Sequence, residues 1–90
     1  MLTEYLAEAV GSFVFFSIIL TKSDAVMIAV ALLVGILLAS VASQGHLNPA
    51  VTVMMYMNGK VDGETGLSYV AAQLVGAVLA VQYARMVKTA

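Results

Sequence analysis

The chain has 90 residues, of which 62% are hydrophobic and only 10% are charged, and its net charge is −1. Soluble domains carry about 25% charged residues, so this composition excludes an ordinary soluble domain and indicates a lipid-embedded chain. The lack of a basic surplus excludes a typical nucleic-acid binder, and the lack of cysteine excludes disulfides and thiolate metal sites. We therefore expect a multi-pass integral membrane protein without a cofactor.

Three apolar segments, residues 2–21, 25–42 and 66–87, are candidates for crossing the bilayer. The second lies in a run without formal charge, residues 25–59, which is too long for one crossing of about 20 residues and too short for two. Residues 43–58 should therefore enter the membrane halfway and return. The expected fold is all-α, with three transmembrane helices and one re-entrant half-helix in a single unit, residues 1–90.

Small residues recur at every fourth position of each segment, for example around Gly11, Gly35 and Gly76. Such stripes let membrane helices approach closely, although small residues are also simply common in membrane helices. Three tyrosines near segment ends, Tyr5, Tyr69 and Tyr83, fit a belt of tyrosines at the membrane interface.

The polar residues of the uncharged run are concentrated at 43–49 (SQGHLNP), which contains the only histidine and the only proline of the chain. Irregular backbone at membrane depth is tolerated only where it is buried in protein or lines a watery cavity. Asn48 and Pro49 predict a helix start, because asparagine caps helices well and proline fits the first helical position. A half-helix starting there would direct its positive dipole end into the membrane and repel cations. The Asn48 amide could donate a hydrogen bond to a passing oxygen, which predicts a pore-lining role.

Residues 45–52 (GHLNPAVT) resemble the first signature loop of the aquaporin and glycerol-facilitator family, the major intrinsic proteins. Glu8, followed by Ser12 and Phe15, is similar to the first-helix motif of that family, and residues 69–77 (YVAAQLVGA) are similar to its third-helix motif. The three elements occur in the family's order and cover nearly the whole chain. The resemblance implies half of an aquaporin, because family members have six spans and two Asn-Pro-Ala half-helices related by an inverted repeat.

A second copy, inverted in the membrane, would supply the missing half. Lys60 lies on one side of the expected topology, and three basic side chains lie on the other: Lys22, Arg85 and Lys88. This difference in the number of basic side chains between the two sides is small enough to allow insertion in both orientations. The resemblance then implies a passive channel for water or small uncharged solutes such as glycerol or ammonia. The pore would be formed by an antiparallel homodimer, with up to four such dimers assembled together.

The resemblance also assigns roles to individual residues. The pore signature consists of Asn48, Pro49 and Ala50. The residues that hold the loop at 43–49 in place are Glu8 and Gln73. The residues that line the pore or form its selectivity filter are Ile28, Gly45, His46 and Val51. Because Val51 stands where the family's second signature loop carries arginine, the constriction would be apolar, and glycerol or ammonia would fit it as well as water.

The same residues also bear on functions other than a channel. A lone histidine makes a poor metal site, so His46 predicts no bound metal. The chain could be a non-conducting subunit or regulator that pairs with another channel protein. It could also be a small efflux transporter with dual topology, for which Glu8 would have to couple transport to protons. An enzyme is not expected, because the sequence offers no nucleophile–base pair, metal cluster or phosphate loop.

Overall fold

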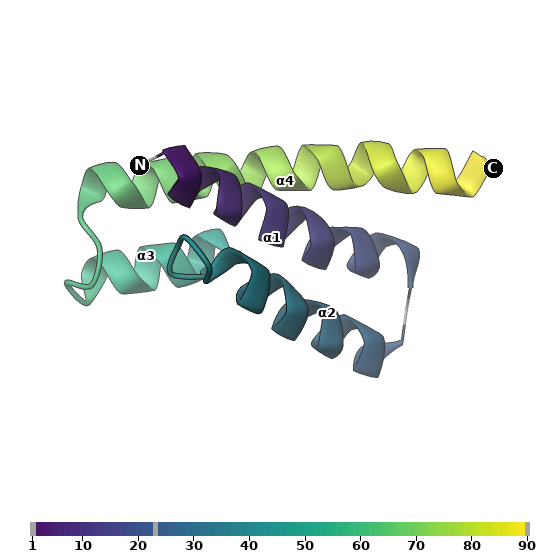
Figure 1. The fold of residues 1–90 in the computed structure, drawn as a ribbon, viewed down its shortest axis with the longest axis horizontal. Coiled ribbons are helices and arrows are strands. Elements are labelled where there is room, and N and C mark those ends of the chain that lie inside the picture. The colour runs from purple at the N-terminus through teal and green to yellow at the C-terminus, as the bar shows by residue number, and fades with distance from the viewer. Residues whose placement is uncertain (1, 23, 90) are drawn as a thin grey trace.

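The computed structural model describes residues 2–22 and 24–89, which form four helices and no strand. The helices are α1 (Leu2–Thr21), α2 (Ala25–Ala39), α3 (Pro49–Met57) and α4 (Gly63–Thr89). α1 is the middle helix and packs against both α2 and α4, while α3 packs against α4. The start of α1, the end of α3 and the start of α4 lie at one end of the molecule; the end of α1, the start of α2 and the C-terminus lie at the other (Figure 1).

The helices fit the expected all-α membrane protein. Among the described residues, α1 and α4 are long and apolar enough to cross a bilayer, and α2 is a shorter apolar helix of 15 residues. α2 ends at Ala39, three residues before the predicted end of its segment at residue 42. The chain turns there because Ser43 is held by Glu8 through a 2.7 Å hydrogen bond, and Gly45 adopts a φ of 67° that side chains rarely allow.

The crossings of α1 with its neighbours depend on glycine. A Cβ atom on Gly11 would lie 2.7 Å from the carbonyl oxygen of Gly35 on α2. A Cβ atom on Gly76 would lie 2.8 Å from the carbonyl oxygen of Ala9 on α1. The backbones therefore touch at both crossings, as the small-residue stripes predicted.

α4 begins at Gly63, three residues earlier than its predicted segment, because Asp62 caps it. The Asp62 carboxylate accepts the Thr65 backbone N–H at 2.7 Å, and the Asp62 carbonyl oxygen accepts the Gly66 N–H at 2.9 Å. The hydrogen bonds from Thr65 hold the pKa of the Asp62 carboxyl below its usual value of 3.8. The cap is therefore strongest when Asp62 is ionised.

This lowered pKa predicts an acid-sensitive start of α4. Asp62 should stabilise the fold fully above about pH 4 and lose that contribution as the pH falls through its lowered pKa, because the folded state then has to take up a proton. Asp62→Asn keeps a capping oxygen but cannot titrate. Thermal unfolding in detergent from about pH 5 to about pH 2, followed by circular dichroism, should show a weaker pH dependence for this variant. An equal pH dependence in both proteins would contradict this assignment.

Candidate functional site

The loop between α2 and α3 is fixed to α1 by Glu8, whose side chain is completely buried. Its Oε2 accepts hydrogen bonds from the Ser43 hydroxyl at 2.7 Å and from the His46 backbone N–H at 3.0 Å. Its Oε1 accepts the Leu47 backbone N–H at 2.9 Å and the Gln73 side-chain amide at 3.0 Å. Two backbone donors thus point at two different oxygens, an arrangement that a carboxylate satisfies completely.

Thr52 on α3 ties the half-helix to the same network. Its hydroxyl oxygen accepts the second N–H of the Gln73 amide at 2.9 Å and lies 2.8 Å from Nδ1 of His46. The single hydroxyl proton has a second acceptor, the Asn48 carbonyl oxygen, only at 3.3 Å. Which atom of the Thr52–His46 hydrogen bond carries the proton depends on the tautomer of the imidazole. Thr52 and Gln73 are both almost completely buried, so α3 is held to α4 by buried polar contacts.

Leu47 packs against the crossing of α1 and α2 and so holds the loop there. It has a φ of 59°, which is uncommon for a residue with a side chain, and it is completely buried. Its two terminal methyl groups would each lie 2.8 Å from a Cβ atom on Gly11 or Gly35, so they rest against the two glycines at the helix crossing. Such a backbone conformation costs about 1–3 kcal/mol and persists where the surroundings fix it. The α1–α2 crossing therefore determines where the loop lies.

Tyr69 is part of this site, and its prediction as an interfacial residue is wrong. The side chain is completely buried on α4, and its hydroxyl oxygen accepts the Gln44 backbone N–H at 2.9 Å. The ring contacts His46 edge to face at a centroid distance of 4.8 Å. Tyr83, in contrast, is 44% exposed, and its interfacial position stays a prediction.

The half-helix α3 starts as the sequence predicts. Asn48 is its N-cap, with Oδ1 accepting the Ala50 backbone N–H at 2.8 Å, and Pro49 occupies the first turn. Asn48 and Ala50 are both exposed. The capping bond uses only the oxygen of the Asn48 side chain, which leaves its NH2 group as a donor for a bound solute.

The expected filter residues are not brought together in one chain. Val51 lies half-buried in the first turn of α3, and Gly45 lies in the loop that precedes it. Ile28 lies in the first turn of α2, at the opposite end of that helix from the loop (Figure 1). Ile28 is eleven residue steps from Ala39, the end of α2, which corresponds to about 16 Å of helix. In the described part of the chain, no three acidic, histidine or cysteine side chains gather as a metal site requires.

Comparisons with known proteins were made for the whole chain. The model of the family described as Major intrinsic protein matches residues 1–90. The chain is 34% identical over 86 residues to Glycerol uptake facilitator protein-like 6 of Lactiplantibacillus plantarum, an alignment covering 86% of the chain and 40% of that relative. It is 48% identical over 63 residues to Aquaporin TIP2-2 of Zea mays, covering 70% of the chain and 25% of that relative. No solved structure matches the chain.

The chain thus spans less than half the length of these two relatives. The family match, however, extends over every element described above, from α1 with Glu8 to α4 with Gln73. The apolar helices agree with the membrane location of this family. The chain therefore belongs to the major intrinsic protein family and is an integral membrane protein.

Proposed function

We propose that this chain forms half of a passive channel for water or small uncharged solutes. The observation that carries the proposal is the loop fixed to α1 by Glu8, with Asn48 exposed at the start of a short helix. The positive end of the α3 dipole and the Asn48 amide together favour a neutral solute with an acceptor oxygen and disfavour cations. The names of the relatives, a glycerol uptake facilitator and aquaporins, point to the same class of solutes.

A second copy of the chain, inverted in the bilayer, supplies the other half of the pore in this proposal. Only Thr52 of the nine α3 residues is buried in the single chain, and most α3 side chains are exposed. Backbone near the middle of a membrane must be covered by protein or line a watery cavity, so this part of the chain needs a partner. Each pore would contain one Asn-Pro-Ala motif from each copy, and up to four such dimers would assemble together.

The constriction of this pore would be apolar, formed by Ile28, Val51 and the Gly45 backbone. Since Ile28 lies far from the other two in one chain, residues from both copies would have to meet there. His46 would stay behind this wall as a loop residue that contacts Thr52. Glycerol and ammonia are therefore included with water as solutes to be tested.

Vesicles that contain only the purified chain provide the test of the function. Stopped-flow light scattering should show faster osmotic volume change than empty vesicles for at least one of water, glycerol and ammonia. Circular dichroism on the same vesicles controls for folding. Folded protein with no permeability above empty vesicles would refute the channel, and recovery of conduction only with another channel protein would favour a subunit or regulator.

Asn48→Asp tests the amide at the centre of the proposed pore. Aspartate keeps the capping oxygen, so the start of α3 should stay intact. It replaces the NH2 donor with a negative charge, which should lower the permeability to neutral solutes several-fold and admit cations. Solute and proton fluxes in the same vesicle preparation measure both effects. Asn58→Asp, at the exposed end of α3, is the matched control and should leave both fluxes unchanged.

A further inference from the structure

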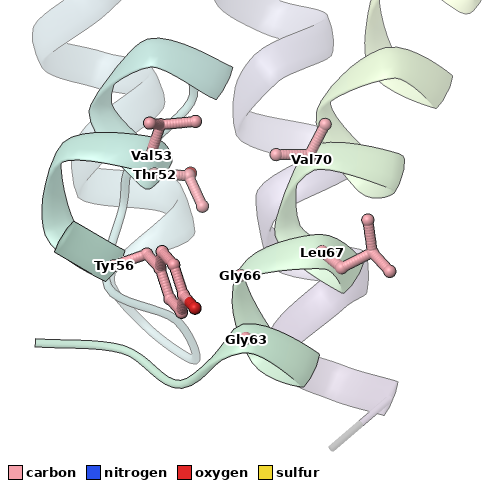
Figure 2. Close-up of a pocket in the computed structure, with 7 residues that line it drawn as sticks. All are labelled: Thr52, Val53, Tyr56, Gly63, Gly66, Leu67 and Val70. Atoms are coloured by element: carbon pink, nitrogen blue, oxygen red, sulfur yellow. The ribbon is translucent and has the colours of Figure 1, made fainter. Parts of the chain in front are cut away.

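Two hollows lie along α4, on opposite sides of that helix. One, of about 340 Å³, lies between α3 and the first half of α4, and its lining includes Tyr56, Gly66 and Leu67 (Figure 2). The other, of about 500 Å³, lies between α1 and the middle and C-terminal parts of α4. We call it the α1–α4 groove, and its lining includes Leu6, Val10 and Phe13 of α1 and Val75, Leu79 and Met86 of α4.

The α1–α4 groove faces away from the half-helix α3. Val75 in its wall follows Gly66, which lines the other hollow, by nine residues, or about 2.5 helical turns. The two residues therefore point to opposite sides of α4. A second copy that meets the chain at α3, as in the channel proposed above, does not cover the α1–α4 groove through that contact.

The groove is as long as the hydrocarbon part of one membrane leaflet. From Val75 to Met86 there are eleven residue steps, which correspond to about 16 Å of helix. The hydrocarbon core of a bilayer is about 30 Å thick, so one leaflet contributes about 15 Å. The bounds of α4, Gly63–Thr89, put the midpoint of the helix at residue 76, next to Val75. The groove therefore extends from the middle of α4 toward one membrane surface.

The lining of the groove is apolar except near its outer end. Val10, Val75 and Leu79 are all exposed to the surroundings of the single chain. Gln82 also lines the groove, and within the described part of the chain its side-chain amide has no hydrogen-bond partner. An amide in apolar surroundings is unfavourable unless a polar group pairs with it. The outer part of the groove therefore favours a ligand that brings a hydrogen-bond acceptor to this depth.

Basic side chains lie beyond the outer end of the groove on both of its helices. α1 and α4 run in the same direction and touch where Ala9 meets Gly76 (Figure 1). Lys22 follows Ala9 by thirteen residues and Lys88 follows Gly76 by twelve, so the two lysines lie at similar heights.

This end of the molecule is positively charged overall. It has three basic side chains and one acidic side chain: Lys22, Arg85, Lys88 and Asp24. The last carbonyl groups of α1 and α4 disfavour an anion, so its attraction to this end depends on the basic side chains.

We propose that the α1–α4 groove binds one anionic phospholipid. An acyl chain lies along the apolar walls, an ester oxygen accepts a hydrogen bond from the Gln82 amide, and the phosphate lies near Lys88 and Lys22. The apolar, amide and basic parts of the groove follow one another in the order of chain, ester and phosphate in such a lipid. Clusters of basic residues next to membrane helices attract anionic headgroups, with an effect of about fivefold in affinity for each residue.

Tryptophan fluorescence tests the site, because the natural chain has no tryptophan. Val75→Trp places a reporter at the deep end of the groove, and Leu74→Trp, one residue away, is the matched control outside it. The two positions are similarly exposed, at 53% and 55%. The vesicles contain phosphatidylcholine and phosphatidylglycerol, and one of the two is brominated in its acyl chains so that it quenches tryptophan on contact. Val75→Trp should prefer phosphatidylglycerol by at least about fivefold, and Leu74→Trp by less than about twofold.

Variants in the Val75→Trp background assign the two polar contacts. Lys88→Gln should lower the preference for phosphatidylglycerol by about fivefold, whereas Lys60→Gln, at the other end of the molecule, should leave it unchanged. Ether-linked phosphatidylglycerol lacks the ester carbonyl oxygens, so it should compete several-fold less well than the ester-linked lipid when Gln82 is present. The two lipids should compete equally in Gln82→Leu.

The other occupants of the groove give different results. Equal quenching of Val75→Trp by both lipids would mean that lipid fills the groove without selection, and would overturn the proposal. Quenching by neither lipid would mean that a second copy of the chain covers the groove, and would also overturn it. An unchanged preference in both Lys88→Gln and Lys22→Gln would refute the phosphate site. Circular dichroism of each variant confirms that the helices are intact, and because no solute flux is measured, the result does not depend on the proposed channel.

Discussion

Replacing Glu8 by Gln is expected to destabilise the fold by about 2–4 kcal/mol and to lower channel permeability at least tenfold. The His46 and Leu47 backbone N–H groups donate to different Glu8 oxygens. Glutamine has only one oxygen, so its NH2 group must face one of these donors and leave it unpaired in a buried place. Hydrogen bonds to charged groups contribute about 1.5–3 kcal/mol each, and an unpaired buried donor costs about 1–3 kcal/mol.

The measurement is unfolding by added SDS, followed by circular dichroism, together with stopped-flow permeability. Glu64→Gln is the matched control, because it makes the same chemical change at an exposed position on α4 and should alter stability by less than about 0.5 kcal/mol. Ser43→Ala removes a single donor to Glu8 and should have an intermediate effect. Equal stability of Glu8→Gln and wild type would mean that the carboxylate is not needed to hold the loop. Loss of conduction only in the presence of a proton gradient would instead support the proton-coupled transporter.

Replacing Gly76 by Ala is expected to produce the second large effect, a loss of about 1–3 kcal/mol or more. The new Cβ would lie 2.8 Å from the Ala9 carbonyl oxygen, 2.9 Å from the Ser12 Cβ and 3.0 Å from the Phe13 nitrogen. Two of these atoms belong to the backbone of α1, so the clash is relieved only if α1 and α4 move apart. That movement would also separate Glu8 on α1 from Gln73 on α4, which are joined at 3.0 Å.

Gly63→Ala is the matched control on the same helix. Its Cβ would meet only the Tyr56 ring at 3.5 Å, an ordinary contact, so this variant should be as stable as wild type or slightly more stable. Melting curves in detergent at low protein concentration compare the two variants without contributions from pairing. Equal destabilisation at both positions would show that the close crossing of α1 and α4 does not determine the effect.

The sequence was sufficient for the fold class and for the family. Composition identified a membrane protein, and the uncharged run of residues 25–59 indicated a half-helix that begins at Pro49, where the structure has it. The motifs around Glu8, Asn48 and Gln73 pointed to the family whose model matches the chain. These signals are local in the sequence, so they can be recognised without a structure.

The details that depend on distant contacts were not predictable. Tyr69 looked interfacial, because nothing near it in the sequence indicates that its partner is the backbone of Gln44. The role of Thr52 was missed, although a hydroxyl on an otherwise largely apolar half-helix was the available signal. The early end of α2 depends on contacts with Glu8 that lie 35 and more residues away. The pore-lining roles of Ile28, His46 and Val51 stay predictions.

The burial of Glu8 has a consequence for how the protein is made. α1 leaves the ribosome first, but the loop donors to Glu8 follow 35 to 39 residues later and Gln73 follows 65 residues later. A carboxylate in the hydrocarbon region is unfavourable without these donors. Stable insertion of α1 therefore depends on the synthesis of α4. Nascent chains that stop before α4 should have α1 less firmly integrated than chains that include α4, so α1 becomes fully integrated only after α4 has been made.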